Sequence, residues 1–408
     1  MAASDLTKTA FIFKRTYSKR KVPETLKRRH PLWMRLYKST DWEGDDDFRY
    51  AVMDADPQGI SGTFAKAQTN NISGPKGNQF QAVRRDRYGY GTINGKALRA
   101  ARSDNGSLMR LVKTNVDGHI NEHQDTLAHA LYRDGTGSRG RVSGTPSGSS
   151  PSVITLQVQD DVRWFKRGMR LISSANANGS SPRNSGAIME VTKVNYTAGT
   201  ITVDTLATGT VNDDYLFRDG EESNTSPAAD GLSALIPATA GTFRGVDCTI
   251  DRERYAGWYL NTPSDSVEDN AGELITRISS YGVSESQMLL VVNPRKAWDV
   301  AKRQQAKVTY DGGGNKALIG FKTFEVITPM GSVTCLPDPD CPITDGYVLT
   351  PDSIEIKCMD DAPHIYMDDE MEFLRVNNED AIEYRSRSFW NTIMYAPVLN
   401  GRFTLNAT

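Results

Sequence analysis

The longest periodic run of hydrophobic positions begins after Gly106. Five apolar residues fall within ~100° of one another on a helical wheel, as one buried stripe of an α-helix would: Val112, Val116, Ile120, Leu127 and Leu131. The pattern stops at Asp134 and Gly135, and glycine commonly follows the last turn of a helix. The pattern therefore predicts one long helix over about 106–134.

Shorter patterns predict the other elements. Five short alternating runs between 152 and 220 are separated by Gly, Asn, Ser and Pro, which indicates a small barrel or sandwich inserted into the surrounding structure. Residues 267–282 are typical of a helix and 288–293 of a buried strand. Residues 294–305 are typical of a second helix that starts with proline.

Three further stretches complete the picture. Residues 380–390 alternate as a strand, with Ile382, Tyr384, Ser386, Ser388 and Trp390 on one face. Residues 57–96 are rich in Gly, Asn, Gln and Lys and favour an extended two-stranded loop, and 135–151 has the composition of a linker.

Charge is unevenly distributed along the chain. Residues 1–38 hold eleven Lys and Arg against two acidic residues, giving +9, and the whole chain of 408 residues carries −2, which leaves −11 for the remainder. The sequence thus predicts a basic arm on an acidic body. Aromatic residues interleaved with the cations favour an arm that lies on a neighbouring subunit over a solvated tail or a nucleic-acid arm, although both of those remain alternatives.

Several classes of protein lose their usual sequence support. The four cysteines form no C-x-x-C pair and are expected to be reduced thiols. No run approaches the ~18 apolar residues of a membrane span, and no apolar segment follows the basic N-terminus as in a secretory signal. We expect a soluble protein that is made inside the cell.

One motif suggests enzymatic chemistry. His119, Glu122 and His123 spell H-x-x-E-H, a zinc-ligand pattern of some metallopeptidases, and helical geometry could let the two histidines share a metal. Gly118 interrupts the motif, however, and no later segment offers a third ligand. A structural helix with partly buried histidines is the preferred interpretation, and the stretch GTGSRG at 135–140 is read as a linker rather than a nucleotide loop.

The order of segments resembles that of the major capsid proteins of tailed bacteriophages, which share the Hong Kong ninety-seven type fold. The resemblance covers nearly the whole chain and is carried by layout together with stretches such as RRDRYGYGTI, LLVVNPRKAW and EYRSRSFWNTIMYAPVLNGRFTL. It implies an α+β fold with an N-arm, an E-loop, a spine helix, a P domain and an A domain, plus the inserted all-β module.

The resemblance also implies domain boundaries. They are an N-arm at 1–47, an E-loop at 48–103, a P domain with spine helix at 104–151, the inserted module at 152–220, a connecting region at 221–261, an A domain at 262–365 and closing P-domain strands at 366–408.

The implied function is structural, with no enzymatic activity and no cofactor. Copies of the chain would form pentamers and hexamers of an icosahedral shell around phage DNA, in a virion assembled in the host cytoplasm. The chain itself would be the main partner, with a portal, a separate scaffolding protein, a possible cement or decoration protein and non-specific double-stranded DNA beside it. No membrane partner and no N-terminal cleavage are expected, and deletion of 1–38 should leave a soluble but assembly-defective protein.

The candidate inter-subunit contacts lie in the arm and the loop. They are Lys14, Arg15, Arg20, Lys21, Arg28, Arg29, Trp33, Arg84, Arg85, Arg87, Tyr88 and Tyr90. Some family members crosslink a loop lysine to an asparagine of a neighbour, and the loose candidates here are Lys66 or Lys76 with Asn377, Asn378 or Asn391. The alternatives are a zinc-dependent hydrolase using 119–123 and another virion protein, such as a tail tube or decoration protein.

Overall fold

The structure is a computed structural model that describes most of the chain from His30 onward. The described residues are 30–42, 47–70, 74–96, 105–147, 150–222, 224, 227–284, 287–305, 325–328, 331–365, 374–376 and 379–407. The predictions for Lys14, Arg15, Arg20, Lys21, Arg28, Arg29, Asn377 and Asn378 lie outside these residues.

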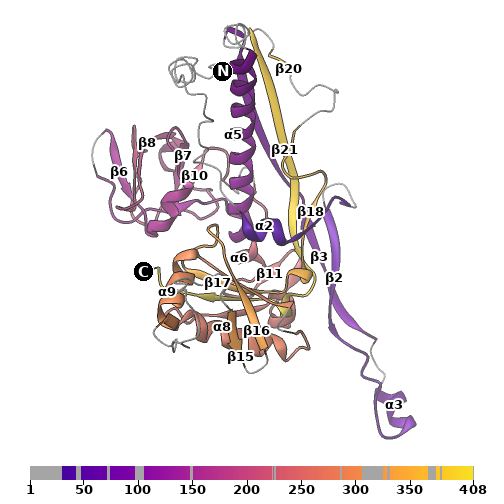
Figure 1. Cartoon of the computed structure of the whole chain (residues 1–408). Coiled ribbons are helices and arrows are strands. Elements are labelled where there is room, and N and C mark those ends of the chain that lie inside the picture. Colours follow the sequence, from indigo (N-terminus) through magenta and orange to yellow (C-terminus); the bar gives the residue numbers. More distant parts are fainter. Residues whose placement is uncertain are drawn as a thin grey trace, which may run out of the picture.

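A long helix lies along a long strand and forms the axis of the molecule (Figure 1). The helix is α5 (Asn105–Tyr132), which confirms the predicted helix and ends just before Gly135, where φ is +81°. The strand is β21 (Ala381–Met394), and its buried positions include Tyr384, Ser386, Ser388 and Trp390, as the alternation predicted.

The sheet around β21 collects strands from both ends of the sequence. β4 (Arg85–Asn94) pairs antiparallel with β21 from Arg85 opposite Trp390 to Asn94 opposite Ala381. The remaining members are β1 (Tyr37–Ser39), β18 (Ile354–Cys358), β19 (His364–Ile365) and β20 (Leu374–Arg375).

A second sheet has the strand order β13-β22-β17-β14-β16-β15. Its strands are β13 (Trp258–Leu260), β14 (Leu289–Val292), β15 (Glu325–Thr328), β16 (Gly331–Pro337), β17 (Asp345–Leu349) and β22 (Gly401–Thr404). Helices α8 (Val267–Ser279) and α9 (Pro294–Gln305) pack against it, and the Ser266 side chain caps α8 by accepting from the Asp269 N–H. The predicted helix, buried strand and second helix are all confirmed.

The predicted inserted module is a closed barrel. Its strands run in the order β5-β10-β7-β8-β9-β6, and a bridge between Val142 and Leu156 joins the two end strands. The strands are β5 (Gly140–Arg141), β6 (Ser152–Thr155), β7 (Arg170–Ser174), β8 (Met189–Asn195), β9 (Thr200–Val203) and β10 (Tyr215–Arg218). We call residues 139–221 the inserted barrel.

Part of the predicted linker at 135–151 belongs to this barrel, so that interpretation was wrong for residues 140–147. β5 pairs with β10, and Ser147 bridges to Val153. Val142 is fully buried in the barrel core. The Gly-Ser composition hid this pairing because a barrel strand of two or three residues needs only one apolar side chain facing inward.

A two-stranded hairpin reaches out from the body (Figure 1). β2 (Asp47–Ala55) pairs with β3 (Lys76–Val83), and the short helix α3 (Phe64–Asn70) lies at the tip. We call residues 47–83 the outward hairpin. The two-stranded loop predicted at 57–96 was therefore misplaced, because its second half is β4 in the β21 sheet.

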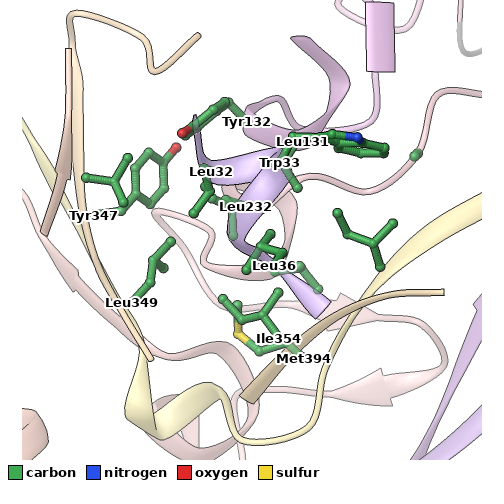
Figure 2. Packing of buried hydrophobic residues seen from close by; sticks show 14 of the residues in the cluster. Leu32, Trp33, Leu36, Leu131, Tyr132, Leu232, Tyr347, Leu349, Ile354 and Met394 are labelled. Carbon is green, nitrogen blue, oxygen red and sulfur yellow. The ribbon is translucent and has the colours of Figure 1, made fainter. Parts of the chain in front are cut away.

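The main core lies where the first described helix meets both sheets. α2 (Pro31–Arg35) buries Leu32 and Trp33, and Leu36 follows it into the same cluster (Figure 2). Tyr132 from α5 and Tyr347 from β17 lie in this cluster too. The segment 30–39 is thus anchored in the core through Leu32, Trp33 and Leu36.

Short elements connect these layers. They are α6 (Leu232–Leu235), β11 (Thr242–Phe243), β12 (Val246–Asp247), α7 (Arg252–Ala256) and the 3₁₀ turns Gln159–Trp164, Arg183–Gly186, Pro351–Ser353 and Pro397–Leu399. No helix in the described part of the chain is long and apolar enough to cross a bilayer. All four cysteines are buried and unpaired.

Candidate functional site

The two histidines of the H-x-x-E-H motif contact serine hydroxyls of β21. Ser386 Oγ lies 2.7 Å from His119 Nε2 and 2.8 Å from His123 Nδ1, and Ser388 Oγ lies 2.8 Å from His123 Nε2. Burial lowers the pKa of His123 to about 4 and also lowers the pKa of His119. Both rings are therefore neutral at pH 7 and act as hydrogen-bonding links between helix and sheet.

Glu122 of the motif turns to the inserted barrel instead. It pairs with Lys166 and with Arg218, whose Nη1 lies 3.2 Å from Glu122 Oε1. Within the described residues, no three His, Cys, Asp or Glu side chains are grouped so that they could hold a metal ion. The described side chains around His119 and His123 thus do not offer the three protein ligands that a catalytic zinc needs.

Glycines of β4 let the helix approach the sheet this closely. A Cβ on Gly89 would lie 2.5 Å from the His119 ring and 2.5 Å from Ser386 Oγ. A Cβ on Gly91 would lie 2.2 Å from the Tyr384 ring. The Tyr-Gly-Tyr-Gly alternation of β4 therefore puts tyrosines on the outer face and empty positions under α5.

The predicted contact residues of this stretch lie on β4 and not in the outward hairpin. Tyr88 is 73% exposed, and its ring packs edge-on against Phe389. Tyr90 is half exposed, and its hydroxyl donates to Glu383 over 3.0 Å. Both tyrosines are therefore available on the surface of the β21 sheet.

The three arginines of the same stretch are more enclosed. Arg84 pairs with Asp86 over 3.1 Å and stacks over Phe389, while Arg85 lies opposite Trp390 in the ladder. Burial lowers the pKa of Arg87, which lines a pocket of about 400 Å³ between β4, α5 and residues 218–221. The pocket brings Arg87 together with His119 and His123. In the sequence these residues belong to two separate motifs.

Trp33 has a structural position in the core. Its ring meets Trp390 edge-on, with the centroids 5.0 Å apart, and the side chain is buried. Trp33 therefore has little exposed surface with which to contact another subunit. Its neighbours Met34 and Tyr37 are 75% and 69% exposed.

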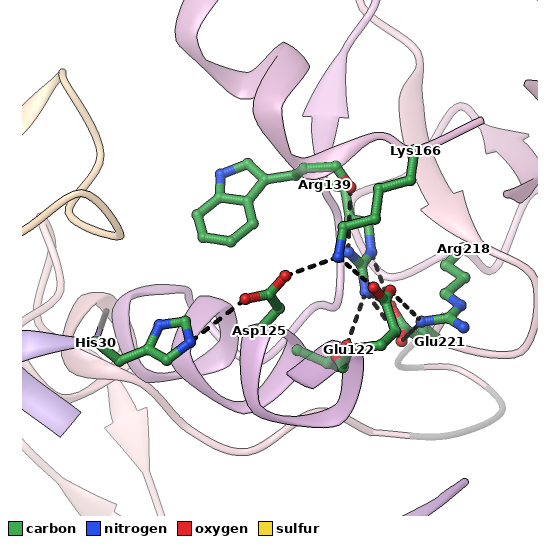
Figure 3. Close-up of polar contacts among 9 residues, drawn as sticks. His30, Glu122, Asp125, Arg139, Lys166, Arg218 and Glu221 are labelled. Carbon is green, nitrogen blue, oxygen red and sulfur yellow. Dashed lines mark hydrogen bonds and ion pairs between the residues drawn. The ribbon is translucent and has the colours of Figure 1, made fainter. Parts of the chain in front are cut away.

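The sequence analysis missed a polar junction around His30. Its Nδ1 lies 2.6 Å from Asp340 Oδ2, and its Nε2 lies 3.3 Å from Asp125 Oδ1 on α5. Asp125 also accepts from Lys166 of the inserted barrel over 2.7 Å (Figure 3). One carboxylate of α5 thus joins the start of the described chain to the barrel. A signal was present, because Pro31 follows His30 and the apolar residues Leu32, Trp33 and Leu36 have helical spacing.

Two further polar contacts join the barrel to α5. Arg133 at the end of α5 donates to Asp161 over 2.7 Å, and the buried Arg139 of the barrel donates to Thr126 Oγ1 over 3.4 Å. Arg139 also pairs with Glu221 over 2.8 Å, which ties the two ends of the barrel together (Figure 3).

The outward hairpin carries exposed apolar side chains. Ile60 is 84% exposed, Phe64 79% and Met53 57%, and α3 has no buried residue. Apolar surface of this kind at the end of an extension is typical of a site that another protein covers.

The candidate crosslinking residues are not equally placed. Lys66 and Lys76 are exposed on the outward hairpin. Asn391 is fully buried, and its side-chain nitrogen donates to the Val83 carbonyl over 2.7 Å. A lysine from another subunit could not reach Asn391 without displacing this packing.

Comparisons with known proteins give a match at the level of structure. Neither a family model nor a curated protein matches the sequence. The capsid asymmetric unit of cyanophage A-1(L) contains a similar chain, with a TM-score of 0.55 and 9% identity over 99% of this chain and 99% of that chain.

Two further solved structures are similar at lower scores. The holo-SrpI encapsulin complex of Synechococcus elongatus gives a TM-score of 0.47 with 8% identity over 100% of this chain and 98% of that chain. The capsid of the native GTA particle gives 0.46 with 9% identity over 97% and 98%. The cyanophage match confirms the predicted α+β capsid fold.

Proposed function

We propose that this chain is a major capsid protein that assembles with copies of itself into the head shell of a tailed phage. The observation that carries the proposal is the cyanophage match, because it spans 99% of both chains with a TM-score of 0.55. Fold alone does not determine function, so the proposal also needs surfaces that suit assembly.

The outward hairpin provides the first such surface. A seven-residue helix is not stable alone in water, and α3 buries no residue within its own chain. Packing of Ile60 and Phe64 against a second copy would supply the missing burial. A contact between two different surfaces of identical copies is heterologous, and such contacts close into rings such as pentamers and hexamers.

The basic arm and the sheet provide further contacts. The +9 charge of residues 1–38 and the −11 charge of the remainder favour an arm that lies on neighbouring subunits, with an affinity that falls as salt rises. Tyr88 and Tyr90 on β4 are the exposed aromatic candidates. Large interfaces built from several such surfaces would make the shell stable.

The proposed setting is a virion that is assembled in the host cytoplasm. Portal, scaffolding and cement or decoration proteins would be partners, with packaged double-stranded DNA nearby and bound without sequence preference. The proposed role is structural, without catalysis.

Electron microscopy of the purified chain tests the proposal. We expect shells or capsomer rings from the wild type and dispersed subunits from the double variant Ile60→Asp, Phe64→Asp, because two charges would be buried at the contact. The matched control is Ile188→Asp, Val211→Asp, which charges two half-exposed apolar residues of the inserted barrel and should still assemble.

Two outcomes would contradict the proposal. One is a wild-type chain that stays as discrete small particles under all assembly conditions. The other is stoichiometric zinc in the purified protein together with hydrolytic activity that His123→Ala abolishes, which would favour the hydrolase alternative.

A further inference from the structure

His30 is held between carboxylates from two different parts of the fold. Asp125 belongs to α5, and Asp340 lies in the turn between β16 and β17. The His30 side chain is only about 8% exposed, and the two aspartates are 6% and 2% exposed. Both ring nitrogens therefore face acceptors inside the protein rather than water.

This geometry requires a protonated ring. An ionised carboxylate only accepts hydrogen bonds, so a contact to a carboxylate from each nitrogen needs an N–H on both. Burial by itself would lower the pKa of His30, but the hydrogen bonds and charges of Asp125 and Asp340 outweigh it and raise the pKa to about 9.

The segment that His30 begins is seated by several contacts in the same place. The Leu32 N–H donates to Asp338 Oδ2 over 3.0 Å, and the Tyr132 hydroxyl donates to the same oxygen over 2.8 Å. Residues 37–39 form β1, which pairs in parallel with β18. We call residues 30–39 the seated segment.

Other titratable groups share this junction with His30. Burial raises the pKa of Tyr132 and of Cys341 well above the usual values, and burial with the nearby Asp340 raises the pKa of Asp338. The charged groups that face His30 or its two carboxylates are Asp125 on α5, Asp338 and Asp340 in the turn, and Lys166 in the inserted barrel.

We propose that His30 is a proton-operated latch: the protonated ring holds the seated segment in the junction, and loss of its proton loosens the segment from the body. Deprotonation removes one of the two N–H donors and leaves Asp125, Asp338 and Asp340 with less compensating charge. Residues 30–39 join the first 29 residues of the basic arm to the body. The latch would therefore set how firmly those residues are anchored in any state of assembly.

The sign of the pH dependence follows from the direction of the pKa shift. A group whose pKa is raised by folding stabilises the folded form fully below its unfolded pKa, and that stabilisation is lost as the pH rises toward the folded pKa. For a rise from 6.5 to about 9, the seating equilibrium falls on the order of 40-fold between pH 7 and pH 9.

Tryptic cleavage of the full-length chain at a series of pH values tests the latch. Cleavage after Arg35 requires the seated segment to open, so its rate follows the open population. Cleavage after Lys66 on the exposed α3 in the same digestion corrects for the pH dependence of trypsin itself. We expect the Arg35 to Lys66 cleavage ratio to rise at least tenfold from pH 7 to pH 9, and a smaller rise overturns the proposal.

Three variants make the test specific. His30→Gln should show a high ratio at pH 7 that no longer changes with pH, and resistance equal to the wild type would overturn the latch. Asp340→Asn removes one carboxylate and should move the rise to lower pH, which keeps the test decisive if His30→Gln does not fold. His123→Gln is the matched control, because that ring is neutral throughout this range and its loss should leave the wild-type pH series unchanged.

Discussion

His30 and His123 show how surroundings set the behaviour of one residue type. His30 lies between carboxylates and has a raised pKa of about 9, whereas His123 lies between hydroxyls and has a lowered pKa of about 4. Below pH 6.5 the unfolded chain binds more protons at His123 than the folded chain, so this group destabilises the fold as the pH falls toward 4. Above pH 6.5 the stabilisation from His30 is lost instead. The two groups together stabilise the folded chain most near pH 6.5.

Gly91 offers the sharpest test of the contact between helix and sheet. In Gly91→Ala the new methyl group would overlap the buried Tyr384 ring, whose hydroxyl donates to the Asn115 carbonyl over 3.1 Å. We expect the free energy of unfolding to fall by about 1 to 3 kcal/mol, as for overpacking in other cores. Urea denaturation of the purified variant measures it.

Gly62→Ala is the control for this substitution. Gly62 lies on the outward hairpin, and a Cβ there meets no atom within 4 Å. Its urea midpoint should match that of the wild type. Equal midpoints for Gly91→Ala and Gly62→Ala would show that the Tyr384 ring of β21 can move away from β4 without loss of stability.

At the scale of elements, the predictable features were those whose signal is local. Helix α9 begins at the proline that marked it, and α8 ends within three residues of its predicted end. Each of these helices has apolar residues at helical spacing, and this pattern is visible within its own short stretch of sequence. The alternation of β21 was equally visible, because every second residue from Tyr384 to Trp390 is buried.

Pairings between distant segments could not be predicted from the sequence. Ser386 is 263 residues from His123, so nothing near the H-x-x-E-H motif showed that hydroxyls would occupy the histidine nitrogens. The glycines of β4 and the serines of β21 were the available signal, since small residues on facing strands leave room for a helix. The core position of Leu32 and Trp33 was hidden by the charge around them, which suggested an arm.

The docking of the inserted barrel on α5 can be tested through Lys166. Lys166→Met would leave the buried Asp125 with His30 as its charged partner, and we expect a loss of about 2 kcal/mol of stability. Because Lys166 and Asp125 are in contact, Lys166→Met and Asp125→Asn should couple by about 1 kcal/mol in a double-mutant cycle measured by urea denaturation.

The control pair for this cycle is Arg141 and Asp213. They lie 3.3 Å apart on the surface of the same barrel, with side chains 41% and 57% exposed. Exposed pairs contribute little, so their cycle should give a coupling close to zero. A coupling near zero for Lys166 and Asp125 as well would mean that Lys166 does not dock the barrel.

At the scale of the whole molecule, the outward hairpin reaches out from a base that is packed on the body (Figure 1). Its strands lie beside the α7 region, where Asn78 donates to the Tyr255 hydroxyl over 2.9 Å, and the described chain begins at the His30 junction. The base buries apolar residues within the chain, whereas Ile60 and Phe64 at the hairpin tip are exposed. In the proposed assembly, a second copy would bury these two side chains.

The position of the arm's base changes what truncation should do. Deletion of 1–38 was expected to leave a soluble subunit, but that cut removes His30 together with Leu32, Trp33 and Leu36, which are buried in the main core. Loss of these three apolar side chains alone would cost about 5 to 8 kcal/mol, comparable to the whole stability of many domains. We therefore expect deletion of 1–38 to unfold or aggregate the chain.

Deletion of residues 1–29 tests the contribution of the arm to assembly while leaving the buried residues of the core in place. It removes nine Lys and Arg and two acidic residues but keeps the seated segment, so the urea midpoint should equal that of the full-length chain. Shell formation followed by electron microscopy should fall, and the shells that remain should respond less to added salt, because the cations proposed to meet acidic neighbours are gone. If both deletion variants unfold at the wild-type urea midpoint, residues 30–38 do not belong to the core. If the variant lacking residues 1–29 forms shells with the wild-type salt dependence, the arm makes no electrostatic contribution to assembly.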